Sequence, residues 1–156
     1  MKRIVEKINY LLIKKRKTLA IAESCTGGQV SKLLTEIKGS SRYFVLGIVA
    51  YSNYAKEKIL KIPHSIILKE GAVSPKTTQL LASSVRKLAC TDIGIGLTGI
   101  AGPTGQTKEK PIGTIFIAIE TKEKAFCRRF LFKGTRSGIR KKAAIKTLEL
   151  LKEVLN

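Results

Sequence analysis

Tryptophan is absent from this 156-residue sequence, and histidine and methionine occur only once each. The three cysteines, Cys25, Cys90 and Cys127, are widely spaced and form neither a CxxC pair nor a disulfide framework. The histidine and the cysteines form no cluster that could bind a metal, and the acidic residues are scattered. We therefore expect no metal, no cofactor, and a reducing, cytoplasmic location.

Long hydrophobic runs are also lacking, since no apolar stretch reaches the ~18 residues of a membrane span. Residues 1–16 are amphipathic and charged throughout, unlike a signal peptide, and we expect no membrane partner. Acidic residues number 11 against 30 Lys and Arg, which gives a formal net charge of +19. This charge favours an anionic partner such as a nucleotide. Few aromatics lie among the basic residues, so a nucleic acid is the less favoured partner.

Apolar periodicity predicts helices and strands that alternate along most of one domain spanning residues 1–156. Helices are expected over 2–16, after Gly28, over 53–60, from Pro75 and from Arg136 to the end, and strands over 18–22, 44–51, 92–98, 115–120 and 125–132. The continuous apolar run at 44–51 indicates a buried strand. A four-residue connection makes the last two strands an antiparallel hairpin.

A polar, glycine-containing turn follows the strand at 18–22 and reads Glu23-Ser24-Cys25-Thr26-Gly27-Gly28. A strand, a glycine turn and a helix in this order present backbone N–H groups and a positive helix end, which suit a phosphate or carboxylate. The turn lacks the GxxxxGK[ST] pattern of nucleoside-triphosphate loops. Simple capping of the helix is the alternative interpretation.

Ser41 and Lys56 flank the strand predicted at 44–51. A serine beside a neutral lysine is a nucleophile and base pair. Because an eight-residue strand spans roughly 25 Å, the two residues meet only if the preceding loop or the following helix folds back. Otherwise Ser41 belongs to a turn and Lys56 is solvated. A Cys25 nucleophile with His64 as its base is less favoured, because no third orienting group is evident and His64 follows Pro63 in a predicted loop.

The segment from Thr98 to Gly105 is a loop rich in small residues, and so many glycines let the backbone itself contact a ligand. Gly94, Gly96 and Gly99 match G-x-G-x-x-G, but they lie within a predicted strand and no helix follows, so we reject a dinucleotide motif. Glycines inside a strand instead predict close approach of another backbone segment. Arg136 opens the last helix. A cation at a positive helix end is unfavourable unless an anion lies there, and solvent exposure is the alternative.

Seven motifs occur together in one order, and each alone is weak. They are Ala22-Glu23-Ser24-Cys25-Thr26-Gly27-Gly28, Gly39-Ser40-Ser41, Tyr51-Ser52-Asn53 with Lys56, Gly71-Ala72-Val73-Ser74, Gly99-Ile100-Ala101-Gly102-Pro103, Lys110-Pro111-Ile112-Gly113-Thr114 and Gly134-Thr135-Arg136. With them the chain resembles, over residues 3–155, the C-terminal domain of the competence- and damage-inducible protein CinA, which also occurs alone as the nicotinamide-nucleotide amidohydrolase PncC.

The resemblance implies a three-layer α/β/α sandwich with a mixed, mostly parallel sheet. It also implies hydrolysis of nicotinamide mononucleotide to nicotinic acid mononucleotide and ammonia in NAD recycling, carried by a serine, a lysine and an arginine. By motif these are Ser41, Lys56 and Arg136. Substrate binding is expected at Ser24, Thr26, Gly27, Gly28, Tyr51, Thr98, Gly99 and Gly102. We further expect a homo-oligomer, either a dimer or a trimer.

The glycine loop departs from the family pattern Gly-Pro-Asp-Gly-Gly, because Thr104 replaces the aspartate and Gln106 replaces the last glycine. These changes leave a catalytically silent nucleotide-binding protein as the first alternative to an enzyme. The second alternative is a basic nucleic-acid-binding protein, supported by the net charge of +19.

Overall fold

The structure, a computed structural model, describes residues 2–156, and its centre is a five-stranded sheet in the order β2-β1-β3-β4-β5. The strands are β1 (Leu19–Glu23), β2 (Phe44–Val49), β3 (Ile93–Gly99), β4 (Thr114–Glu120) and β5 (Ala125–Leu131). β1 is parallel to β2 and β3, whereas β4 is antiparallel to both of its neighbours. The predicted mixed sheet and terminal hairpin are confirmed. Four of the five strands, β2, β1, β3 and β5, run in the same direction and β4 runs in the opposite one, so the sheet is mostly parallel, as predicted.

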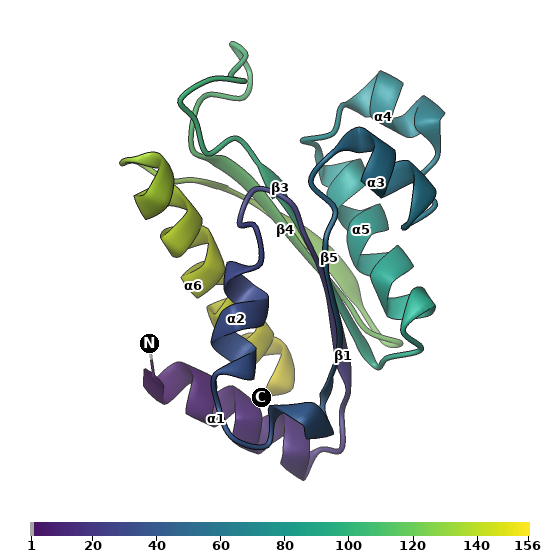
Figure 1. Cartoon of the computed structure of the whole chain (residues 1–156), viewed down its shortest axis with the longest axis vertical. Helices are drawn as coiled ribbons and strands as arrows, with labels where there is room; N and C mark the ends of the chain where they lie inside the picture. Colours follow the sequence, from purple (N-terminus) through teal and green to yellow (C-terminus); the bar gives the residue numbers. More distant parts are fainter. Residues whose placement is uncertain (1) are drawn as a thin grey trace.

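Helices cover both faces of the sheet and complete the three layers (Figure 1). One face carries α1 (Lys2–Lys14), α2 (Gln29–Thr35) and α6 (Arg136–Leu155), and the other carries α3 (Asn53–Lys58), α4 (His64–Glu70) and α5 (Pro75–Leu88). A short 3-10 helix, η1 (Ser40–Arg42), precedes β2. No helix within residues 2–156 has the length and hydropathy needed to cross a membrane.

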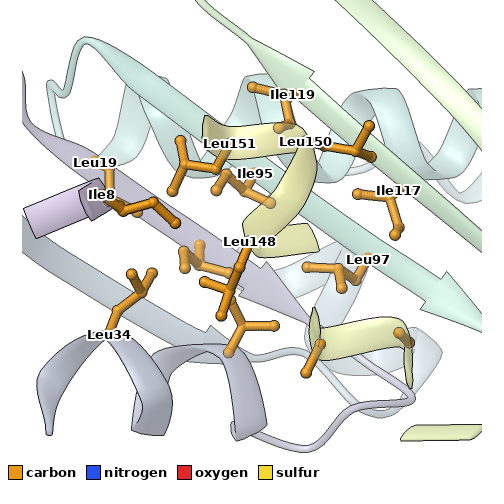
Figure 2. Close-up of a cluster of buried hydrophobic side chains, with 14 of the residues drawn as sticks. Ile8, Leu19, Leu34, Ile95, Leu97, Ile117, Ile119, Leu148, Leu150 and Leu151 are labelled. Atoms are coloured by element: carbon orange, nitrogen blue, oxygen red, sulfur yellow. The ribbon is translucent and has the colours of Figure 1, made fainter. Parts of the chain in front are cut away.

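Each helical layer encloses its own hydrophobic cluster. The larger one packs α1, α2 and α6 against the sheet through residues such as Ile8, Leu34, Ile95, Ile117 and Leu148 (Figure 2). The smaller one joins Ala20 and Ala22 of β1 to Leu60, Ile67, Leu81 and Val85 on the opposite side. Ala20 and Ala22 are two positions apart and face the smaller cluster, whereas Leu19 and Ile21 face the larger one. Side chains that alternate along a strand point to opposite faces of the sheet.

The glycines of β3 allow α5 to lie directly on the strand. A Cβ atom at Gly94 would lie 2.1 Å from the carbonyl oxygen of Ala82, and one at Gly96 would lie 2.4 Å from that of Thr78. Close backbone approach, predicted from glycines inside a strand, is confirmed. The role of Gly94 and Gly96 is therefore to let α5 pack against β3, which agrees with the rejection of a dinucleotide motif.

Two sequence expectations differ from the structure. β2 is an edge strand of the sheet that residues 2–156 form, and it is not buried on both faces, because its alternate residues are exposed on one of them. The segment after Pro63, expected to be a loop, forms α4, since proline suits the start of a helix as well as its end. Parallel pairing of β1, β2 and β3 brings the three carboxyl ends to one edge of the sheet.

Candidate active site

A cleft of about 260 Å³ opens at the edge of the sheet where β1, β2 and β3 end. Its lining comes from the segment after β1 (Ser24, Cys25), the segment after β2 (Tyr51, Asn53, Lys56), the loop after β3 (Thr98–Gly102, Thr104, Gly105) and Arg136 at the start of α6, together with Ala72 and Val73. The carboxyl edge of an open α/β sheet is where such proteins commonly bind ligands.

Lys56 forms the floor of this cleft and is 2% exposed. The helix that carries it, α3, begins at the N-cap Ser52, whose hydroxyl accepts a 3.1 Å hydrogen bond from the Ala55 N–H. The Lys56 Nζ atom lies 2.9 Å from the Ala50 carbonyl oxygen, 3.1 Å from that of Tyr51 and 3.3 Å from the Ser24 hydroxyl oxygen. All three partners belong to the ends of β1 and β2.

The environment of Lys56 makes its neutral form easier to reach than it is in water. Among residues 2–156, no carboxylate forms an ion pair with it. Burial lowers the pKa of Lys56 from its ordinary value, because desolvation penalises the ammonium. The Nζ atom donates to the two carbonyls and to the Ser24 hydroxyl. In the neutral amine two N–H groups suffice for the two carbonyls, and the lone pair can then accept the Ser24 proton. Ser24 and Lys56 therefore have the arrangement of a nucleophile and its base.

Cys25 also lines the cleft, but its environment does not suit a nucleophile. Burial raises the pKa of its thiol to about 12, so the reactive thiolate is scarce at neutral pH. His64 lies at the start of α4, where its Nδ1 is 2.9 Å from the Glu57 carboxylate, and it is not among the residues that line the cleft. The structure thus does not pair Cys25 with His64.

The turn after β1 is organised by the fully buried carboxylate of Glu23. This group accepts hydrogen bonds from the Thr26 hydroxyl, from the N–H groups of Gly28 and Val30, and from both the N–H and the hydroxyl of Ser31. The start of α2 therefore already holds an internal anion. None of Thr26, Gly27 and Gly28 lines the cleft, so their expected part in substrate binding stays a prediction.

Arg136, the first residue of α6, lies at the rim of the cleft. Its guanidinium donates hydrogen bonds to the Gly102 carbonyl and to the Tyr51 hydroxyl, the latter at 2.9 Å. These contacts join the glycine loop, the end of β2 and the start of α6. A guanidinium has five N–H donors, so others remain for an anionic ligand at this positive helix end.

The comparisons with known proteins agree with this architecture. Residues 1–155 match the family model described as the CinA C-terminal domain. The chain belongs to this family. A CinA-like protein of Syntrophus aciditrophicus is 46% identical over 93% of the chain. The chain spans about a third of that relative's length, 35%.

Solved structures show the same fold. The competence damage-inducible protein A of Klebsiella pneumoniae superposes with a TM-score of 0.95 at 29% identity, over 99% of this chain and 96% of that one. The competence/damage inducible protein CihA of Agrobacterium tumefaciens gives 0.95 at 30% identity, over 99% of this chain and 94% of that one. The predicted family and α/β fold are thereby confirmed.

In this CinA C-terminal domain, the expected contact between Ser41 and Lys56 is not formed within one chain. Ser41 lies in η1, before β2 begins, whereas Lys56 follows the end of β2. The strand alone separates them by about 20 Å, and neither flanking segment folds back. Ser41 is exposed and does not line the cleft described by residues 2–156.

The remaining expected binding residues do meet at the cleft of the CinA domain. They are Ser24, Tyr51, Thr98, Gly99 and Gly102. Thr98 is held by its own hydrogen bond, 2.9 Å, to the Ala72 carbonyl. Sequence reasoning placed Ser24 among the binding residues but missed its contact with Lys56. The contact could have been predicted from the sequence, because both residues follow the carboxyl ends of predicted strands.

Residues 2–156 contain no cluster of three or more potential metal ligands.

Proposed function

We propose that this CinA C-terminal domain hydrolyses the carboxamide of nicotinamide mononucleotide, giving nicotinic acid mononucleotide and ammonia. The observation that carries the proposal is the buried Lys56 amine, without a carboxylate partner among the described residues and 3.3 Å from the Ser24 hydroxyl in an open cleft. Amide hydrolysis needs such an activated nucleophile. The choice of substrate rests on the family resemblance.

In the first step, the neutral Lys56 amine accepts the proton of Ser24 while the Oγ atom bonds to the amide carbon. The Ala50 and Tyr51 carbonyls hold the two N–H groups of the amine, and they also stabilise the ammonium that forms. Collapse of the tetrahedral intermediate breaks the C–N bond. Lys56 returns its proton to the leaving nitrogen, which departs as ammonia, and Ser24 remains esterified.

Water completes the cycle. The again neutral Lys56 takes a proton from a water molecule as the water oxygen attacks the ester carbon. The C–O bond to Ser24 then breaks, and the proton returns to the serine oxygen. The product forms as a carboxylic acid, which loses its remaining proton to solvent and becomes the carboxylate, and the enzyme regains its starting protonation state without a metal or cofactor in any step.

Arg136 is proposed to bind the phosphate, with the glycine loop Gly99–Gly105 along the ribose. Its position at the first turn of α6 adds a positive helix end to a cationic side chain. The Glu23 turn suits this role less well, because the N–H groups of Gly28, Val30 and Ser31 already bond to Glu23. Binding of the remote phosphate orients the amide toward Ser24, which lowers the entropic part of the barrier.

The deciding experiment measures ammonia release from nicotinamide mononucleotide by the wild type, Ser24→Ala and Lys56→Met. Both substitutions are expected to lower kcat by about a thousandfold or more, as for other nucleophile and base pairs. Ser65→Ala, an exposed serine on α4, is the matched control and retains wild-type turnover. Circular dichroism verifies that each variant is folded.

Ser41→Ala separates the two serine assignments. Loss of turnover in Ser41→Ala together with normal turnover in Ser24→Ala would overturn the role given to Ser24. Trapping of the acyl intermediate on Ser24, detected by mass spectrometry after acid quenching, would support the role directly.

A silent nucleotide-binding protein is the second candidate, and Thr104 favours it. This residue replaces the aspartate of the family pattern and lies in the lining of the cleft. Nucleotide binding by calorimetry without ammonia release from the wild type would select this candidate. Restored release in Thr104→Asp would then identify the substitution as the cause.

A further inference from the structure

The turn that carries Ser24 is held by an arginine from a distant part of the chain. The Arg140 side chain, in the second turn of α6, donates a 2.8 Å hydrogen bond from its Nη2 atom to the carbonyl of Thr26. Thr26 is fully buried, and it is two residues from Ser24. Arg140 is not among the residues that line the cleft, so it reaches the site only through this turn.

The Thr26 carbonyl needs a donor from elsewhere. In a continuing helix it would accept the Val30 N–H, because helical N–H groups donate to the carbonyl four residues earlier. Here the Glu23 carboxylate accepts the Val30 N–H at 3.2 Å. Arg140 supplies the donor instead, so the turn is fixed both by the Glu23 carboxylate and by the Arg140 guanidinium.

Gly27 is explained by the same contact. A Cβ atom at this position would lie 2.6 Å from the Arg140 Nη2 atom, and its φ of +62° lies in the left-handed region that favours glycine. The Gly27 N–H also donates a 3.1 Å hydrogen bond to the Ser24 carbonyl. The guanidinium therefore packs directly on the short turn that begins at Ser24.

The bonding of Arg140 is devoted to this turn. Among residues 2–156 its side chain forms no ion pair and no other hydrogen bond, and its buried Nε atom has no partner. Burial raises the pKa of the Cys25 thiol, and the charges of Arg140 and Lys56 both act against this rise. The guanidinium and the Lys56 amine are thus both close to the residue that follows Ser24.

We propose that Arg140 is a positioning residue, which keeps the Ser24 Oγ atom within reach of Lys56 by holding the Thr26 carbonyl. This inference rests on the proposed amidase function. A displacement of the reacting atoms by about 1 Å lowers a rate by on the order of a hundredfold, even when the altered residue is remote from the chemistry. Loss of the Arg140 contact frees the turn to move and so lowers kcat.

The two arginines at the start of α6 then have separate tasks. Arg136 and Arg140 are four residues apart, and such residues lie on one face of a helix. Arg136 is at the rim of the cleft and is proposed to bind the phosphate, whereas Arg140 lies against the turn of the nucleophile. Removal of Arg140 should therefore change kcat and not KM, with or without a phosphate on the substrate.

The test compares ammonia release from nicotinamide mononucleotide and from its riboside by the wild type, Arg140→Met, Arg140→Lys and Lys141→Met. Arg140→Met is expected to lower kcat by about thirtyfold for both substrates, with KM within about twofold of the wild type. Arg140→Lys keeps a charged donor and should recover kcat to within about fivefold. Lys141→Met removes an exposed cation from the next position of α6 and is the matched control with wild-type turnover.

Gly27→Ala breaks the same contact without removing the charge. Its new methyl group would meet the flexible end of the Arg140 side chain and displace it. The variant should show the same fall in kcat, and an unchanged KM distinguishes this effect from the loss of a ligand contact. Gly27→Ala keeps the test decisive if Arg140→Met folds poorly.

Amide hydrogen exchange gives a readout that does not need turnover. In the free protein, exchange within residues 23–31, followed by mass spectrometry, is expected to rise by about tenfold in Arg140→Met and to stay unchanged in Lys141→Met. Unchanged exchange in Arg140→Met would overturn the proposal, as would a raised KM with kcat retained. Absence of ammonia release from the wild type would overturn the amidase function, and the exchange rates alone would then decide whether Arg140 holds the turn.

Discussion

Lys56 and Ser24 are 32 residues apart in the chain, yet the Nζ atom of one lies 3.3 Å from the Oγ atom of the other. The contact arises because β1 and β2 are parallel neighbours and end at the same edge of the sheet. Ser24 follows β1 directly, and Lys56 follows β2 after one turn of α3. The pairing is thus a consequence of strand order.

The stability of the protein should depend on pH through Lys56. Its folded-state pKa lies below the ordinary value of 10.5, so the unfolded chain binds the proton more tightly. Stability attributable to this group is therefore lowest below the folded pKa and rises with pH up to 10.5. Lys56→Met lacks this titration and is expected to be more stable than the wild type at neutral pH. The difference in the free energy of urea unfolding should shrink toward alkaline pH, and a difference independent of pH would contradict the prediction.

Glu23→Gln should destabilise the protein by about 3 kcal/mol, because an amide cannot accept all the hydrogen bonds that the buried carboxylate accepts. Urea unfolding measures the effect. Glu36→Gln removes an exposed carboxylate that forms an ion pair with Lys32 at 3.5 Å, and this control should change stability by less than about 0.5 kcal/mol. Equal effects of the two substitutions would show that the Glu23 bonds are not the cause.

Arg136→Lys should separate phosphate binding from chemistry. Loss of the planar, two-pronged donor is expected to raise KM for nicotinamide mononucleotide by about tenfold, with a smaller change in kcat. The corresponding riboside, which lacks the phosphate, serves as the control substrate, and its KM should change little. An equal decrease in kcat for the mononucleotide and for the riboside would instead indicate that Arg136 acts at the reacting amide.

Gly96→Ala should destabilise the fold by about 3 kcal/mol or more, because the new methyl group would lie 2.4 Å from the Thr78 carbonyl oxygen and 2.7 Å from the Ala82 nitrogen. Gly138→Ala is the matched control, since its methyl group would lie 3.3 Å from the Thr135 side chain on the helix surface. The control should stay within about 1 kcal/mol of the wild type. Thermal unfolding of both variants gives the comparison, and a mild effect at Gly96 would mean that α5 can shift away from β3.

Much of the fold could be predicted from local sequence. The helical spacing of Ile8, Leu11 and Leu12 in α1, the Ser74-Pro75 start of α5 and the short β4–β5 connection were each sufficient, since periodicity, capping and turn length act over a few residues. The edge position of β2 was not predictable in this way. An apolar run looks the same whether a partner strand lies beside it or not.

The sequence by itself determined the family, the order of helices and strands, and the residues from which a site could be made. Tertiary structure alone decided which of these residues act together. Parallel pairing of β1 and β2 placed Lys56 beside Ser24 and left Ser41 at the other end of the strand. It also brought the Glu23 carboxylate to the N–H groups at the start of α2, although the sequence of this turn was equally compatible with an external anion. Local patterns specify segments, whereas contacts between segments depend on strand order and direction, which short-range periodicity does not encode.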